Sequence, residues 1–254
     1  NVSTKVEPID GDVICERAMY GDDRTWAHDS IGVTTPSPAQ DWLLAEGSTD
    51  GGMETWLLVQ NPYKTAVNVD IVFQTDAGPV APPDLQGVTI PAESRSTFPV
   101  NNYVTNYNVS TYVMAQDGLV VCERAMYGNS RAWAHDSVGT SVASDEWYMA
   151  EGSTLGGMET WLLVQNPGDT DVHINVTFNT DVGDIAPLDL QGTTIPANSR
   201  RTFKVNDWVT TYEVSTYVQC TDGFVVCERA MYGGDRTWAH DSIGAFAAMP
   251  TWYL

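Results

Sequence analysis

The residues best suited to chemistry lie in one short string, VCERAMYGNSRAWAHDS at 121–137, which holds a cysteine and the run His135-Asp136-Ser137. Serine, histidine and an acid are the residue types of a hydrolase triad, in which histidine takes the serine proton and the acid orients the imidazole. Neighbouring residues of a strand point to opposite faces, so these side chains cannot converge on one strand. The sequence also lacks the G-x-S-x-G turn that exposes a nucleophilic serine. We therefore predict no catalysis.

Metal binding is the second chemistry that this string suggests. His135 and Asp136, together with Glu151 from a downstream AEGST segment, offer nitrogen and oxygen ligands, and an acidic surface suits Ca²⁺. However, the sequence contains no D-x-D-x-D-G loop and no H-x-x-x-H pair. We expect no dedicated metal site and no cofactor, and we keep Ca²⁺ as an alternative.

The string occurs three times, as ICERAMYGDDRTWAHDS at 14–30 and VCERAMYGGDRTWAHDS at 226–242 in addition to the central copy, and recurrence favours architecture over a site. Glu123 and Arg124 point to opposite faces of a strand, so each needs a partner of its own, because an unpaired buried charge is costly. Six of the nine arginines lie in the three copies. In a chain with so few basic residues, this indicates that these arginines have specific partners. We predict a structural lock between these guanidinium groups and carboxylates of the HDS and AEGST segments, made by Arg17, Asp29, Glu46, Arg124, Asp136, Glu151, Arg229 and Asp241.

Longer repeats organise the whole chain. The block WLLVQNP at 56–62 recurs at 161–167, and Trp42, Trp147 and Trp252 follow each other at steps of 105 residues. The stretch after Gly32 absorbs a two-residue insertion and carries Pro, Ser and Thr, which is typical of a linker. We predict a partial module at 1–34, a linker at 35–41, a β-sandwich module at 42–139, a linker at 140–146, a second β-sandwich module at 147–244, and a linker with the start of a next module at 245–254.

Within each module the signals indicate strands. Val172, Ile174, Val176 and Phe178 alternate with polar residues, which predicts a half-buried strand. Asp-Gly pairs at 117–118 and 222–223 predict hairpin turns, and no stretch sustains a helical period. The stretches 56–61 and 120–127 are apolar on both faces, so we expect both of their faces to be covered. The predicted fold class is all-β, with tandem immunoglobulin-like β-sandwich modules of about 105 residues.

Composition narrows the possible partners. With 12 Lys and Arg against 33 Asp and Glu, the net charge is −21, which repels nucleic acid and anionic lipid. No apolar run approaches the roughly 18 residues of a membrane helix, so we expect no membrane insertion. The sequence begins at Asn1 without an initiator Met or a leader, so we expect a processed or excised piece of a longer chain.

The cysteines and tryptophans are interpreted first as packing residues. Cys15, Cys122 and Cys227 are equivalent and lie a module apart, too far to bridge, although Cys220 and Cys227 could form a disulfide across a hairpin. Nine tryptophans could form a glycan-stacking platform, but their regular recurrence favours packing. Asn1, Asn108 and Asn175 open N-x-[ST] sequons, and Asn108 and Asn175 are our candidates for N-glycosylation.

The blocks LLAEGST, WLLVQNP, ERAMY and HDSIG together resemble a tandem immunoglobulin-like repeat domain family of unknown function. Its modules occur in large secreted and cell-surface proteins of actinobacteria and other prokaryotes. The resemblance covers essentially the whole chain, and it implies an extracellular location and a modular β-sandwich fold. The cysteine before Glu-Arg departs from a more usual small apolar residue, which leaves open whether that cysteine only packs. The family supplies no catalytic residues.

The leading functional hypothesis is an extracellular structural repeat protein, part of a cell-surface layer, stalk or filament. The alternative is an adhesin or carbohydrate-binding module that uses Trp-rich loops, and a third hypothesis is a hydrolase that uses the His-Asp-Ser run. A sandwich that lacks most of its strands, as 1–34 would, exposes open edges that pair with other chains. We therefore expect self-association as a head-to-tail homopolymer or surface assembly, with glycan as a further possible partner.

Overall fold

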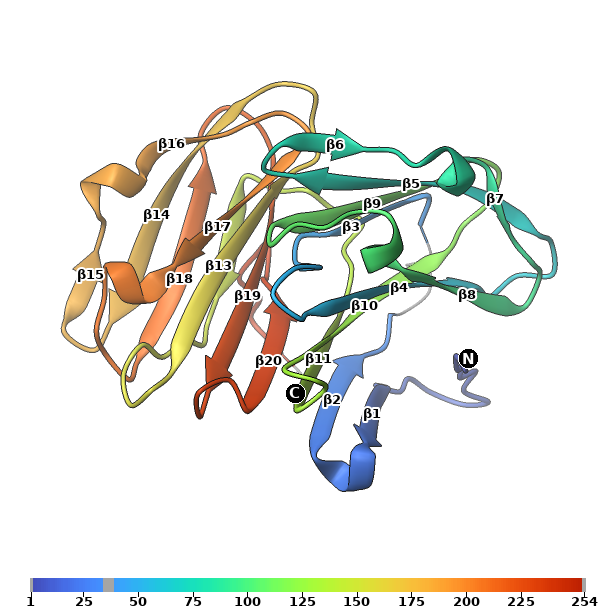
Figure 1. Ribbon diagram of the computed structural model, residues 1–254, viewed down its shortest axis with the longest axis horizontal. Coiled ribbons are helices and arrows are strands. Elements are labelled where there is room, and N and C mark those ends of the chain that lie inside the picture. Colours follow the sequence, from blue (N-terminus) through green and yellow to red (C-terminus); the bar gives the residue numbers. More distant parts are fainter. Residues whose placement is uncertain (1, 34–38, 253–254) are drawn as a thin grey trace.

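The computed structural model describes residues 2–33 and 39–252, and within them it contains strands and short 3-10 turns but no α-helix. The strands pair into antiparallel sheets that form two sandwich-like halves (Figure 1). The all-β fold class of tandem sandwich modules that the sequence predicts is therefore confirmed. Asn1, residues 34–38 with most of the first predicted linker, and residues 253–254 lie outside the described residues.

The first half is built from β3 (Asp41–Leu44), β4 (Glu54–Asn61), β5 (Val67–Thr75), β6 (Gly78–Val80), β7 (Val88–Ile90), β8 (Ser94–Pro99), β9 (Val109–Ala115), β10 (Val121–Gly128) and β11 (Trp133–Val138). One of its sheets has the order β3-β9-β5-β6, with β7 also paired to β5, and the other has the order β11-β10-β4-β8. The buried core lies between these two sheets, because it draws residues from strands of both.

The second half is built from β12 (Glu146–Met149), β13 (Glu159–Asn166), β14 (Val172–Thr180), β15 (Gly183–Ile185), β16 (Gln191–Ile195), β17 (Ser199–Lys204), β18 (Val214–Cys220), β19 (Val226–Gly233) and β20 (Trp238–Ile243). Its sheets have the orders β12-β18-β14-β15, with β16 on β14, and β17-β13-β19-β20. This order repeats that of the first half strand for strand. No helix of the described part of the chain has the length and apolar character needed to cross a membrane.

The N-terminal strands β1 (Glu16–Gly21) and β2 (Trp26–Ile31) form a two-stranded sheet of their own. They are the counterpart of the hairpins β10–β11 and β19–β20, and all three hairpins end on the same Gly-to-Trp pair. Short 3-10 turns connect strands at η1 (Asp22–Arg24), η2 (Pro83–Leu85), η3 (Val100–Asn102), η4 (Leu188–Leu190) and η5 (Val205–Asp207).

Two equivalent tryptophans close the cores of the two halves. Trp42 and Trp147 are buried, and their indole N–H groups donate to the carbonyls of Val120 at 2.7 Å and Val225 at 2.8 Å. A buried indole N–H needs an acceptor, and here it ties the first strand of each half to the segment before β10 or β19. The alternating apolar residues of β5 and β14 are buried, as their pattern predicts.

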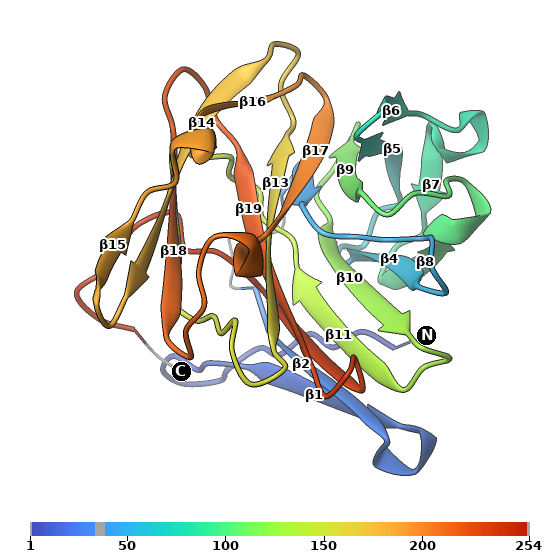
Figure 2. The same cartoon turned by 60° about the vertical axis from the view of Figure 1, so that its left-hand side comes forward.

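The three hairpins that carry the repeated string lie next to one another, with β11 between β2 and β20 (Figure 2). Every residue of β11 is buried, whereas β2 and β20 keep exposed residues. Strand β19 is also buried along its whole length, and β10 is buried or half-buried throughout. The string is therefore covered where modules meet.

Candidate functional site

Each of the three hairpins has two chemically different faces. Residues opposite each other on paired strands share a face, as do residues two apart on one strand. The register of β19–β20 defines an Arg face, which carries Arg229, Met231, Trp238, His240 and Ser242. The opposite, Glu face carries Glu228, Ala230, Tyr232, Ala239, Asp241 and Ile243. The same division applies to β1–β2 and β10–β11, because their sequences and registers correspond.

The hairpins stack with the Arg face of one module on the Glu face of the next. In the first junction, the Arg face of β1–β2 contacts the Glu face of β10–β11. In the second junction, the Arg face of β10–β11 contacts the Glu face of β19–β20. The repeated string is therefore the contact surface between successive modules.

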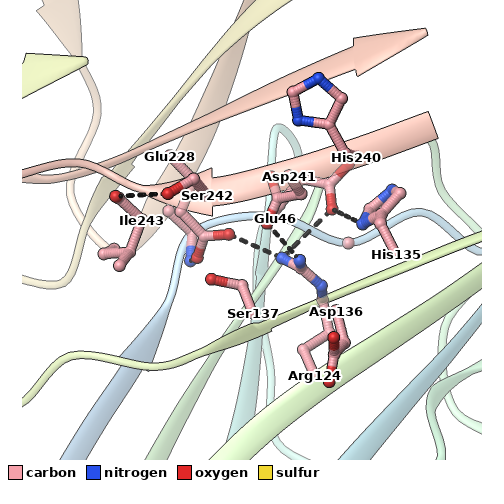
Figure 3. A network of polar contacts seen from close by, with 12 residues as sticks. Glu46, Arg124, His135, Asp136, Ser137, Glu228, His240, Asp241, Ser242 and Ile243 are labelled. Atoms are coloured by element: carbon pink, nitrogen blue, oxygen red, sulfur yellow. Dashed lines mark hydrogen bonds and ion pairs between the residues drawn. The ribbon is translucent and has the colours of Figure 1, made fainter. Parts of the chain in front are cut away.

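Arg124 is the centre of the second junction (Figure 3). Its Nη1 lies 2.7 Å from Glu228 Oε2 and 3.1 Å from Glu46 Oε2, and its Nη2 lies 2.6 Å from Asp241 Oδ2. All four side chains are buried, with exposed fractions of 1%, 1%, 4% and 0% for Arg124, Glu228, Glu46 and Asp241. Charge-assisted hydrogen bonds of this kind are strong because water does not compete for the groups. One guanidinium thus joins a loop of its own module to both strands of the next hairpin.

The electrostatics of this cluster follow from three carboxylates around one arginine. Burial disfavours a charged guanidinium, but Asp241, Glu228 and Glu46 outweigh it and raise the pKa of Arg124 well above its ordinary value. Burial raises the pKa of Asp241 well above its ordinary value, although Arg124 opposes the shift. Burial likewise raises the pKa of Glu46. Burial also disfavours a charged Glu228, but Arg124 and a hydrogen bond with Asp241 outweigh it and lower the pKa of this glutamate.

The first junction repeats this arrangement with fewer partners. Arg17 pairs with Asp136 and, at 3.2 Å, with Glu123 Oε2. His28 Nδ1 lies 2.7 Å from Asp136 Oδ1. The carboxylates that bind Arg17 occupy the positions of Glu228 and Asp241 one module earlier.

Aromatic side chains extend both junctions beyond the charges. The Trp26 ring meets Tyr127 edge-on at a centroid distance of 5.3 Å, and Trp133 meets Tyr232 in the same way at 5.2 Å. In each case the tryptophan belongs to the Arg face of one hairpin and the tyrosine to the Glu face of the next. Edge-to-face pairs of this kind add about 0.5–1.5 kcal/mol beyond the area that they bury.

A loop of the first module enlarges the second junction. The backbone N–H of Ala45 donates to Glu228 Oε1 at 2.7 Å. Arg200 donates to the carbonyls of Gly47 and, at 2.8 Å, Val109, and burial lowers the pKa of this arginine to about 10. The AEGST segment is thus held by charged side chains of the next module as well as by Arg124.

The corresponding surface of the first half is an open groove of ≈ 880 Å³ between β1 and the outer faces of β4 and β8. Trp56 and Leu58 line it, and Arg95, the counterpart of Arg200, donates to the Val2 carbonyl at 2.9 Å. The outward apolar residues of β4 are therefore only half-buried, whereas Leu163 of β13 is buried. The expectation that residues 56–61 are covered on both faces is therefore met only in part in β4. The equivalent strand β13 of the second half is covered more fully.

The residues of the hypothetical triad do not converge. His135 is buried and stacks on Trp133 at a centroid distance of 5.5 Å, and burial lowers its pKa well below the ordinary value. Asp136 points to the opposite face and binds Arg17. The Ser137 hydroxyl donates to the Val138 carbonyl at 3.2 Å. Each side chain therefore has a separate environment, as strand alternation predicts.

The ligand set that the sequence suggests for a metal is also separated. His135 lies with Glu46 and Asp241, and these three offer ligand atoms within 4.8 Å of one another. Glu151 instead lies beside His240, with 3.7 Å between Glu151 Oε1 and His240 Nε2. Arg124 already binds both carboxylates of the Glu46 group, so a divalent cation there would face a buried positive charge. Arg124 itself neutralises this cluster.

The structure brings most residues of the predicted lock together, in some pairs that cross modules and others that lie within one module. Arg17 meets Asp136, and Arg124 meets Asp241, as well as Glu46 from the AEGST segment of its own module. Arg229 meets Glu151 Oε2 at 3.2 Å, also within its own module. Within the described residues, Asp29 makes no ion pair with an arginine. A hydrogen bond with Asp29 raises the pKa of Glu16, and the Asp29 carboxylate also acts electrostatically on the His240 imidazole.

Sequence analysis missed the glutamates of the string itself as lock residues. Glu123 and Glu228 bind the arginine of the preceding module. The signal was present, because a glutamate on the face opposite the arginine requires a partner of its own. The missing step was that the partner is the same string, one module earlier.

The glycan-related candidates are mostly engaged in packing or hydrogen bonds. Asn108 accepts a hydrogen bond from Thr202 of the other half at 2.6 Å, and Asn175 accepts one from the Gly192 N–H at 2.9 Å. Both asparagines are half-buried. Among the described residues, the exposed tryptophans are Trp238 and Trp252.

The structure contains all four cysteines as free thiols, without a bond between Cys220 and Cys227. Burial raises the pKa values of Cys122 and Cys227 well above the ordinary value, and the thiolate is the reactive form. We expect a thiol reagent to modify Cys15, which is half-buried, in the native protein and to leave Cys122 and Cys227 unmodified until denaturant is added. Mass spectrometry of the labelled protein measures this, and rapid native labelling of Cys122 would contradict it.

Comparison with known proteins places one repeat in a described family. Residues 29–126 match a family of unknown function, DUF5719. This stretch runs from Asp29 of the first string to Met126 of the second, which is about one repeat and less than half of the chain. The match agrees, for this repeat, with the resemblance to a domain family of unknown function. No curated protein sequence matches the chain.

Solved structures give distant likenesses. The crystal structure of Thermotoga maritima 1070 is similar at 16% identity and a TM-score of 0.37, over 41% of this chain and 96% of that one. Streptomyces avermitilis alpha-L-rhamnosidase, complexed with L-rhamnose, is similar at 11% identity and a TM-score of 0.26, over 83% of this chain and 28% of that one. The crystal structure of red sea bream transglutaminase is similar at 9% identity and a TM-score of 0.19, over 82% of this chain and 31% of that one. None of these likenesses informs the function of the chain.

Proposed function

We propose that this chain is part of an extracellular structural repeat protein that builds a cell-surface layer, stalk or filament and performs no catalysis. The observation that carries the proposal is the use of the repeated string. Its arginine, glutamate and aspartate side chains bind between modules at both junctions. A string that serves as a contact surface in every copy has the role of a connector.

The buried ion pairs at the junctions support an array of modules with fixed relative orientations. A buried network tolerates few alternative geometries, because any displacement leaves desolvated charges unpaired. Successive modules are therefore fixed in orientation, unlike beads on a flexible linker. The net charge of −21 suits a solvated surface in a cation-containing medium and disfavours contact with nucleic acid.

Immunogold labelling of intact cells tests this proposal. Antibodies against the purified chain are expected to label the outer surface in an ordered pattern, as a layer, a stalk or a filament. Permeabilised cells are the control, because they show the total amount of antigen. Label that appears only after permeabilisation would contradict the proposal.

The alternative function is an adhesin or carbohydrate-binding module. It draws on the exposure of Trp238 and Trp252, since tryptophan faces stack on sugars. A glycan array with the purified chain separates the two proposals. Specific retention of a glycan that is lost in a Trp238→Ala variant would favour the adhesin.

A further inference from the structure

A cleft of ≈ 470 Å³ lies on the second half, between β16 and β17, which are strands at one edge of its two sheets. Thr193 of β16, Arg201 and Phe203 of β17, Asp189 of η4 and Trp208 after η5 line it. Clefts of about 300–1,000 Å³ that combine aromatic surface with a few polar groups are the usual sites of small ligands. The cleft therefore has the size and the composition of a binding site.

The stacking of one module on the next uses a different part of the surface. Arg200 of the second half donates to the carbonyls of Gly47 and Val109 of the first half, and Gln165 donates to Gln74. The first half carries the counterparts of the cleft residues at Asp84, Val88, Ser96, Phe98 and Tyr103. Among the described residues, none of these counterparts forms a hydrogen bond or an ion pair with the second half. A repetition of the stacking step therefore leaves the cleft open to solvent.

The Trp208 ring is fixed in place by its neighbours. Its indole N–H donates to the Asp189 carboxylate, with Nε1 3.2 Å from Oδ1 and 3.0 Å from Oδ2. The ring stacks on the buried Phe178 at a centroid distance of 6.2 Å, and its centroid lies 6.5 Å from that of Phe203. Asp189 is exposed, so its carboxylate oxygens keep lone pairs for a ligand. The cleft thus offers an oriented aromatic ring beside a hydrogen-bond acceptor.

Arg201 supplies the hydrogen-bond donors. Its guanidinium carbon lies 5.5 Å from the centroid of the Phe203 ring, and its Nη1 donates to the Thr194 carbonyl at 3.1 Å. In the part of the chain that the structure describes, Arg201 forms no ion pair, although acidic residues outnumber basic ones by 33 to 12. A guanidinium carries five N–H donors, so most of those of Arg201 are available to a ligand.

We propose that this cleft binds a neutral sugar, a pyranose unit of a glycan. In the complex, Arg201 and Asp189 bind hydroxyl groups of the sugar, and Trp208 covers one face of the ring. This site goes beyond the structural function proposed above and does not depend on it.

The chemistry of the cleft favours a neutral sugar over charged ligands. The cleft contains a cation and an anion that do not pair with each other, so a ligand of either charge meets a like charge. A sugar hydroxyl is both a donor and an acceptor, and it therefore suits Asp189 as well as Arg201. The C–H groups on a face of the pyranose ring pack on the electron-rich face of an aromatic ring. The net charge of −21 further disfavours an anionic sugar.

The first half does not repeat this chemistry. Ser96 occupies the position of Arg201, and Tyr103 occupies the position of Trp208. A serine at this position supplies no guanidinium donors, and the smaller ring of Tyr103 offers less area to a sugar. We therefore expect the site in the second half of the chain and not in the first.

NMR of the full, ¹⁵N-labelled chain tests the proposal, because each of the nine tryptophans gives an indole N–H signal. Trp208→Tyr and Trp238→Ala identify the signals of these two residues. The chain is titrated separately with the methyl glycosides of glucose, galactose, mannose and N-acetylglucosamine. We expect at least one of them to shift the Trp208 signal to saturation and to leave the Trp238 signal unchanged.

Arg201→Ser introduces the residue of the first half and is expected to weaken this binding at least tenfold. Arg24→Ser is the matched control. Arg24 is also exposed and also lies over an aromatic ring, at 5.6 Å from the centroid of Tyr20. Its replacement is expected to leave the titration unchanged, and thermal unfolding verifies that both variants are folded.

Three results would overturn the proposal. The Trp208 signal could stay in place with all four glycosides, or Arg201→Ser could bind as tightly as the unmodified chain. Alternatively, the zwitterionic dipeptide glycylglycine could shift the Trp208 signal where no glycoside does, which would make the cleft a peptide site. None of these results changes where antibodies label cells, so this site and the structural function fail or stand separately.

Discussion

Replacing Arg124 with alanine is expected to lower the free energy of unfolding by about 3–5 kcal/mol, as for one partner removed from a buried ion-pair network. The substitution leaves Glu46, Glu228 and Asp241 in a buried site without their shared cation. Carboxylates in that position must take up protons or draw in water, and both routes cost free energy. Urea unfolding followed by tryptophan fluorescence measures the loss.

The matched control is another arginine of the same string. Arg131 pairs with Glu54 Oε2 at 2.6 Å, but its side chain is 50% exposed. Exposed pairs contribute about 0–1 kcal/mol, so Arg131→Ala is expected to change stability within that range. Equal effects of the two substitutions would show that the buried network does not stabilise the module contact, and the lock interpretation would be wrong.

Gly128→Ala is expected to destabilise the chain by about 1–3 kcal/mol, the usual range for overpacking. A Cβ at Gly128 would overlap the ring of Trp133, its cross-strand partner. That ring cannot retreat, because it is buried beneath Tyr232 of the next module. The glycine is therefore required by the junction, since it provides the space in which the tryptophan lies.

Gly233→Ala provides the comparison at the last hairpin, whose tryptophan, Trp238, is exposed. A Cβ there would overlap Trp238 in the same way, but this residue is 41% exposed and its ring can turn toward solvent. We expect a change of less than about 1 kcal/mol, partly offset by the smaller entropy of the unfolded alanine chain. Both variants are compared in the same urea titration. A Gly233→Ala effect as large as that of Gly128→Ala would place the cost in the hairpin instead of the junction.

Some of the fold and of the site could be predicted because it depends on local geometry. The alternation of Val172, Ile174, Val176 and Phe178 predicted β14, and these residues are buried in the core. The same period of two places Glu123 and Arg124 on opposite faces, which led to the prediction that each binds a separate partner. Strand alternation is a property of the backbone, so it can be read without knowing what covers either face.

The module that supplies each partner could not be predicted, because the partners are distant in sequence. Arg124 pairs with residues 104 and 117 positions away, and Arg17 with a residue 119 positions away. Asp29 and Asp136 occupy equivalent positions, yet Asp136 binds an arginine and Asp29 remains exposed on the open Glu face. Nothing in the local string distinguishes the two, since the difference arises from the module that stacks on one of them.

The sequence by itself therefore determined the strands, the repeats and the two-faced character of each hairpin, because these follow from backbone geometry and from side-chain type along a few residues. Only the tertiary structure decided that the Arg face of one hairpin meets the Glu face of the next. It also decided that His135 is buried beside Tyr232, although the same residue types could have lined an open cleft. Stacking depends on how whole modules pack, and packing sums contacts that no short stretch of sequence contains.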